Sequence, residues 1–191
     1  MEGVLANAKG AAERVHSALE PTVSAPGLLV AGSDETFRGF VHDMLAFAAR
    51  LEEVRNRFGR LIGLSGPQYT ILISIAHLQG TQGVGINAVA RHLRLSGAFV
   101  TIEVNRLVAD GLVTKAVNPS DRRRVLLRLT ENGRARLARL SPTQVRANDL
   151  IFGSLGRSEF LVLHRKIGDL VEGGDAALAL LEGLETQSAP R

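Results

Sequence analysis

The hydrophobic pattern of this chain changes its period once, near residue 111, and that change limits the folds open to it. Between residues 66 and 110, apolar residues recur three and four positions apart, which is typical of helices that bury one face. Two stretches, 112–117 and 125–129, then read as short strands, and in the second Val125, Leu127 and Leu129 alternate with Leu126 and Arg128. We therefore predict a mainly α-helical fold with one small β-hairpin.

Residues that begin or end helices divide the 66–110 region into three helices. The first begins at Gly66-Pro67 and stops at about residue 78, before a glycine-containing turn, and the second is short, at 86–93. Ser96 is a good N-cap for a third helix over about 97–110, which Gly111 ends. The order is helix, short helix, tight turn, helix and hairpin, with a polar hairpin tip at 118–124.

A heptad pattern of apolar residues precedes this region, over about 35–62. It lasts three heptads, and its spacing is typical of a helix that packs along one seam. Either the core of its own domain or a second chain can cover such a seam. The members of the seam are Phe40, Met44, Phe47, Leu51, Val54, Phe58 and Leu61.

The two ends of the chain are also predicted to be helical. A short helix is expected within 4–19, and Ser33 or Asp34 should cap the long helix that follows. After Thr130 the helical pattern resumes and should bend at Ser141-Pro142. A last helix is expected over 157–171, ended by Gly173-Gly174, with a further short helix within 175–185.

Composition excludes several classes of function. None of the 191 residues is cysteine, so disulfides, thiolate metal sites and cysteine nucleophiles are excluded. No nucleophile elbow, phosphate loop or metal-ligand spacing is present, so we expect neither an enzyme nor a cofactor or metal site. No signal or membrane segment is evident, which predicts a cytoplasmic protein that does not contact a membrane.

The distribution of basic residues is more informative than the net charge of +4. Arginine supplies 20 of the 23 basic residues, which a GC-rich genome would also explain. Three consecutive arginines, however, stand in the hairpin tip, and an anionic partner would stabilise such a run. A helix of the size predicted at 97–110 fits the DNA major groove, and a hairpin beside it can reach the backbone or minor groove.

Three segments resemble the MarR family of bacterial transcription regulators, which are winged helix-turn-helix proteins. The most diagnostic is Asp121-Arg-Arg-Arg-Val-Leu-Leu-Arg-Leu129-Thr130-Glu-Asn-Gly133, which is similar to the D-x-R wing and the L-T-x-x-G that follows it. Gly66-Pro67-Gln68-Tyr69-Thr-Ile-Leu72 and Leu107-Val-Ala-Asp-Gly111-Leu112-Val113 resemble the second helix and the end of the recognition helix. The resemblance implies a DNA-binding regulator, in most cases a repressor, that acts as a homodimer on a pseudo-palindromic operator.

The resemblance also implies which residues meet double-stranded DNA. The helix that starts at Ser96 would enter the major groove, where Asn105 could bind adenine and Thr101 a base or phosphate. Arg123 would enter the minor groove, and Asp121 would orient it. The full set of predicted DNA contacts is Arg91, Arg94, Ser96, Gly97, Ala98, Thr101, Asn105, Arg122, Arg123 and Arg124.

The front of the predicted recognition helix departs from the family pattern. Residues 96–105 contain no lysine or arginine and instead include Phe99, Ile102 and Glu103. Base recognition would then depend on Thr101, Asn105, the wing and thymine-methyl contacts from Ala98 or Ile102. The alternative is a winged-helix protein-interaction module whose DNA binding is weak or lost.

Two further sites are implied by the resemblance. The dimer would be held by the long helix and the last two helices, through Phe40, Met44, Phe47, Leu51, Phe160, Leu163 and Ile167. A small aromatic or phenolic ligand would bind between the dimer helices and the winged domain and release the DNA. The candidate ligand residues are His42, Phe47, Arg50 and Tyr69, because an aromatic acid requires apolar walls and a cation.

The predicted domain organisation follows from these assignments. Residues 1–33 form an N-terminal helix and linker, 34–172 a MarR-like domain, and 173–191 a C-terminal extension. Within the central domain we expect the winged helix-turn-helix at about 64–133, with dimerisation helices at about 35–62 and 134–172.

Overall fold

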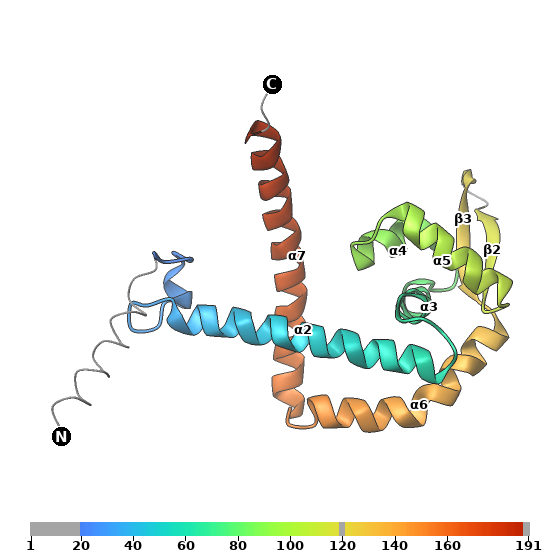
Figure 1. Cartoon of the computed structure of the whole chain (residues 1–191), viewed down its shortest axis with the longest axis horizontal. Helices are drawn as coiled ribbons and strands as arrows, with labels where there is room; N and C mark the ends of the chain where they lie inside the picture. The colour runs from blue at the N-terminus through green and yellow to red at the C-terminus, as the bar shows by residue number, and fades with distance from the viewer. Residues whose placement is uncertain (1–19, 119–120, 189–191) are drawn as a thin grey trace, which may run out of the picture. The chain divides into compact units, whose positions relative to one another are not determined.

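The computed structural model describes residues 20–118 and 121–188, and it divides the chain into two compact units. The first unit extends to Thr130 and the second begins at Glu131. Helices dominate both units, and a small sheet completes the first (Figure 1). The predicted N-terminal helix at 4–19 lies outside the described residues.

Four α-helices of the first unit match the predicted order. They are α2 (Glu35–Leu61), α3 (Gly66–Leu78), α4 (Ile86–Leu93) and α5 (Gly97–Ala109). Ser65 caps α3 in a capping box, in which its hydroxyl accepts from the Gln68 N–H and the Gln68 side chain accepts from the Ser65 N–H. A local sequence signal therefore sets the start of α3.

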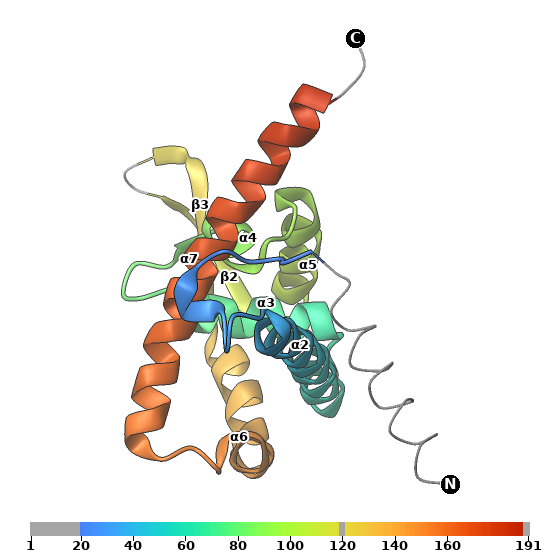
Figure 2. The same ribbon diagram turned by 90° about the vertical axis from the view of Figure 1, so that its left-hand side faces the viewer.

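The sheet has three antiparallel strands, one more than the sequence predicts. β2 (Val113–Asn118) and β3 (Asp121–Leu129) form the expected hairpin, and β1 (Val84–Gly85) pairs with the other edge of β3. β1 has only two residues, so no alternation can reveal it. Figure 2 shows the hairpin projecting as an arm from the helices of this unit.

The core of the first unit lies between α3, α5 and the sheet. Ile71, Leu72 and Ile75 of α3 are fully buried, as are Val100, Val104 and Leu107 of α5. Leu112 and Leu127 close this core from the hairpin side. Leu127 and Leu129 stand two residues apart on β3, so one face of that strand is buried under the helices.

Only the C-terminal end of α2 is buried. Phe58 packs edge-on against Tyr69 of α3, with ring centroids 6.0 Å apart, and Gly59 lies beside it. A Cβ on Gly59 would come within 2.9 Å of the Ser65 carbonyl oxygen, so the chain passes too closely there for a larger residue. Toward its N-terminus, the heptad seam of α2 remains exposed, including Phe40, Met44 and Phe47.

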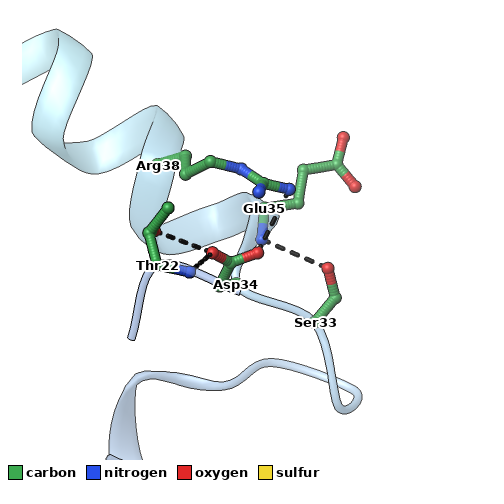
Figure 3. A network of polar contacts seen from close by, with 5 residues as sticks. All are labelled: Thr22, Ser33, Asp34, Glu35 and Arg38. Atoms are coloured by element: carbon green, nitrogen blue, oxygen red, sulfur yellow. Dashed lines mark hydrogen bonds and ion pairs between the residues drawn. The ribbon is translucent and has the colours of Figure 1, made fainter. Parts of the chain in front are cut away.

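A polar clasp holds the chain that leads into α2 (Figure 3). The carboxylate of Asp34 accepts from the backbone N–H and the hydroxyl of Thr22, at 2.7 and 2.8 Å, and pairs with Arg38 at 3.1 Å. Asp34 stands at the N-cap position, yet its side chain makes no capping bond. Ser33 caps instead, because its hydroxyl accepts from the Glu35 N–H at 3.2 Å.

The second unit consists of two long helices. α6 (Glu131–Phe152) continues through Pro142 and bends along its course, as Figure 1 shows. α7 (Arg157–Ser188) runs without a break through Gly173-Gly174, so the predicted helix end there is wrong. Glycine weakens a helix by only about 1 kcal/mol and keeps its N–H, and the alanine- and leucine-rich residues that follow favour helix.

Candidate nucleic-acid interface

The turn between α4 and α5 is set by Arg94, which adopts the left-handed conformation with φ of 54°. This conformation lets the Leu95 N–H bond to the Ala90 carbonyl at 3.0 Å and redirects the chain within two residues. The Ser96 hydroxyl then accepts from the Phe99 N–H at 3.2 Å and begins α5. The two helices thereby form a helix-turn-helix.

The burial pattern of α5 differs from the prediction at Glu103. Val100, Val104 and Leu107 are buried as expected, but Glu103 is also only 5% exposed and lies on the buried side. Its carboxylate pairs with Arg106 of the same helix at 2.6 Å. Glu103 therefore does not belong to the exposed front of the recognition helix, because its position on the helical wheel places it beside the core.

The other predicted positions on α5 reach solvent to different extents. Ala98 and Asn105 are exposed, whereas Thr101 and Gly97 are partly buried. The Thr101 hydroxyl donates to the Gly97 carbonyl at 2.7 Å, so it is already engaged with its own helix. An oxygen acceptor on DNA would have to compete with that bond.

Asp121 organises the tip of the wing. One of its carboxylate oxygens accepts from the Arg123 backbone N–H at 3.1 Å, and the other pairs with Arg124 Nε at 3.0 Å. The side chains of Arg123 and Arg124 are exposed, and the side chain of Arg122 lies outside the described residues. Asp121 thus fixes the backbone at Arg123 but pairs with the guanidinium of its neighbour.

A cleft of about 370 Å³ lies between α4, α5 and the wing. It brings together four residues predicted to contact DNA, Arg91, Thr101, Arg123 and Arg124, which come from three separate elements. Three guanidinium groups around one concave surface repel one another and form a favourable site for anionic groups. The predicted contacts Arg94, Ser96, Gly97, Ala98 and Asn105 do not line this cleft.

Three polar residues near this surface were not predicted. Asn87 of α4 and Asn118 of β2 line the cleft, and Lys115 of β2 donates from Nζ to Asn105 Oδ1. Lys115 therefore adds a cation beside the predicted base-reading residue. The sequence marks Lys115 only as a member of a predicted strand, and the packing of the hairpin against α5 shows which residue it meets.

The four predicted ligand residues occupy different environments. Tyr69 is 1% exposed and packs on Phe58 near the C-terminal end of α2. His42, Phe47 and Arg50 are exposed farther toward the N-terminus of α2, and Arg50 donates to the Ala46 carbonyl at 2.8 Å. Because a helix rises about 1.5 Å per residue, His42 lies roughly 24 Å along the axis from Phe58. Tyr69 is therefore remote from His42.

The residues predicted for dimerisation are mostly accessible. Phe40, Met44, Phe47, Phe160, Leu163 and Ile167 have between 37% and 53% of their surface exposed, and Leu51 is partly buried. No described residue of α7 is buried, although many of its side chains are large and apolar. Contiguous apolar surfaces of this kind are typical of helices that meet a partner.

Neither a metal cluster nor a spanning helix is found among the described residues. Within 20–118 and 121–188, no three histidine, aspartate or glutamate side chains gather as metal ligands would. No single helix in those ranges has the length and hydrophobicity needed to cross a membrane. α2 and α3 pass that test only as a pair, and the chain bends by 92° between them.

Helix-turn-helix, three-stranded sheet and basic wing together define the winged helix-turn-helix class of proteins. Residues 62–124, which contain the helix-turn-helix, β2 and the start of β3, match the model of the MarR family. The resemblance to that family is therefore confirmed, and the chain has the fold of a MarR-family transcriptional regulator.

Solved structures support the same assignment. The PcaV transcriptional regulator from Streptomyces coelicolor, in complex with its natural ligand, is 26% identical, with a TM-score of 0.51 over 67% of this chain and 91% of PcaV. MarR from E. coli is 19% identical (TM-score 0.52, 68% of this chain and 94% of MarR). The M. tuberculosis regulator MOSR, in complex with DNA, is 22% identical (TM-score 0.54, 72% and 96%). No curated protein matches the chain.

Proposed function

We propose that this protein is a sequence-specific DNA-binding transcriptional regulator. The observation that carries the proposal is the cleft between α4, α5 and the wing, which Arg91, Arg123 and Arg124 line together with Thr101 of α5. A helix in the major groove with a basic wing beside it reads bases and holds phosphates at the same time. With DNA as the partner, we infer that the protein acts in the cytoplasm. The proposed function requires no catalytic step.

Binding to a duplex from the protein's own promoter region tests this proposal. Fluorescence anisotropy at several salt concentrations should give an affinity that falls steeply with salt, because neutralised phosphates release counterions. Arg123→Ala should weaken binding by roughly 1–3 kcal/mol. Arg165→Ala, which removes the same charge from an exposed position of α7, serves as the control and should have a smaller effect. No binding to any upstream fragment would refute the proposal.

The regulator is proposed to act as a homodimer on a pseudo-palindromic operator. Two exposed apolar surfaces support this, the N-terminal part of α2 and the seam of α7 that includes Phe160, Leu163 and Ile167. Light scattering should give twice the mass of 20.4 kDa at micromolar concentration. Leu163→Asp should shift the mass toward a single chain, because it places a charge in the apolar seam. A single-chain mass for the unaltered protein would contradict the dimer.

Release by a small aromatic or phenolic ligand is proposed as the means of control. The support is the S. coelicolor regulator, whose structure contains its natural ligand, and the aromatic and cationic residues Phe47 and Arg50 on α2. Benzoate and 4-hydroxybenzoate are suitable probes. At millimolar concentration either should release the promoter duplex, and a reporter under that promoter should then be derepressed if the protein is a repressor. Failure of both compounds, with binding otherwise intact, would count against an aromatic acid as the ligand.

A protein-interaction module remains the second candidate function. The observation that favours it is the exposure of Leu95, Phe99 and Ile102 at the start of α5. DNA affinity would then be weak and nearly independent of sequence. A difference of at least tenfold between the promoter duplex and a scrambled duplex at moderate salt would exclude it.

A further inference from the structure

The solvent-facing side of α5 is centred on three residues. Val100, Val104 and Leu107 form the buried side, and each residue advances about 100° around a helix. Ala98, Ile102 and Asn105 therefore lie nearly opposite the buried stripe, and all three are exposed. Ile102 has 51% of its surface exposed, the largest fraction among the large apolar residues of α5.

The chemistry of this side is unusual for a helix that enters a groove of DNA. Ala98 and Ile102 present only methyl and methylene groups, and Asn105 is the single hydrogen-bonding residue among the three. The cations of the region stand at its flanks, with Lys115 beside Asn105 and three arginines around the cleft. Arg106, at the far end of α5, is held by Glu103.

We propose that this helix recognises thymine through its methyl group, with Ile102 as the contacting residue and Ala98 beside it. Of the four bases, only thymine presents a methyl group in the major groove. Guanine and cytosine present polar groups there, and Ile102 would deprive those groups of water without offering a hydrogen bond. Each half of the operator should therefore place a thymine opposite Ile102.

The surroundings of Ile102 favour DNA over a protein as the occupant of this surface. On the same helix as Ile102, Thr101 lines the arginine cleft and Asn105 is contacted by Lys115, so cations that suit phosphate lie close to this apolar spot. A protein partner would have to cover these cations with acidic groups of its own. This inference rests on the proposed DNA-binding function and specifies the base that it reads.

Selection of DNA followed by removal of single methyl groups tests the inference. Purified protein would first select duplexes from a library with a 20-base-pair random core. Each thymine of the selected half-site would then be replaced by deoxyuridine, which keeps every hydrogen-bonding group and removes only the methyl. Affinities would be measured for the wild type, for Ile102→Ala and for Ile102→Leu, after circular dichroism has verified that each variant is folded.

We expect one or two thymines at which deoxyuridine weakens binding by the wild type about fourfold, the equivalent of one buried methylene. Ile102→Ala should lose this penalty, whereas Ile102→Leu should keep most of it. Equal binding to thymine and deoxyuridine at every position would overturn the inference and leave DNA binding intact. The same penalty in Ile102→Ala would also overturn it. If no duplex is selected, the proposed function itself fails.

Discussion

The carboxylate of Asp121 accepts a hydrogen bond from the backbone N–H of Arg123, at 3.1 Å, at the tip of the wing. An acidic residue at this position opposes DNA binding electrostatically, since it lies beside the arginines that would meet phosphate. Asp121 must therefore contribute to DNA binding by positioning the backbone of the wing and not through its charge.

Asp121→Ala is accordingly expected to weaken DNA binding by several-fold, although it removes a negative charge. The hydrogen bond to the backbone and the pair with Arg124 are both lost, so Arg123 is no longer held in one orientation. Asp121→Asn, which keeps an acceptor oxygen, should restore part of the affinity. Anisotropy titrations of the three proteins on one duplex would measure this, and tighter binding by Asp121→Ala would show that charge dominates.

Lys115 is expected to contact phosphate while it supports Asn105. Lys115→Ala should weaken binding on all duplexes alike and should reduce the salt dependence of the affinity by about one phosphate contact. Asn105→Ala should leave the salt dependence unchanged and should relax the preference for one base pair. Measuring log affinity against log salt for both variants separates the two roles. If Lys115→Ala leaves the slope of log affinity against log salt unchanged, Lys115 does not contact phosphate.

The clasp between Thr22 and Asp34 should make the segment before α2 sensitive to acid. The hydrogen bonds that Thr22 donates hold the pKa of Asp34 below its usual value, and the charge of Arg38 lowers the pKa further. Because its pKa is lowered, Asp34 stabilises the fold at pH values above the usual pKa of aspartate. This contribution is lost as the pH falls through the pKa of the folded state.

Limited proteolysis between residues 20 and 33 should therefore accelerate below about pH 4 in the wild type. Asp34→Asn should show the faster cleavage already at pH 7 and little further change in acid. Thr22→Val, which removes only the hydroxyl donor, should fall between the two. Cleavage of Asp34→Asn that matches the wild type at pH 7 would argue against the clasp.

Two glycines of α2 should respond oppositely to alanine. At Gly59 the new Cβ would lie 2.9 Å from the Ser65 carbonyl oxygen and 3.1 Å from Tyr69 Cβ, so Gly59→Ala should destabilise the protein by about 1–3 kcal/mol. At Gly39 nothing lies within 4 Å, so Gly39→Ala should stabilise the helix by roughly 0.5–1 kcal/mol. Urea denaturation of both variants measures the difference. Equal effects would contradict the close approach of α2 and α3.

Several features could be predicted because their causes are local. The helix boundaries around α3 and α5 follow from Ser65 and Ser96, whose hydroxyls bond to backbone N–H groups three residues away. The hairpin follows from the alternating pattern that ends in the buried Leu127 and Leu129. Gly173-Gly174 does not end α7, because the alanine- and leucine-rich residues that follow favour the helix more than the two glycines weaken it.

Three features can be predicted without the folded structure: the order of the helices and the hairpin, the apolar seams of α2 and α7, and the group of arginines at the wing. These depend on periodicity and on contacts between near neighbours. Only the folded structure shows that β1 pairs with β3 and that Lys115 meets Asn105. Each of these depends on how α5 and the hairpin pack against the rest of the unit, and no local pattern encodes that packing.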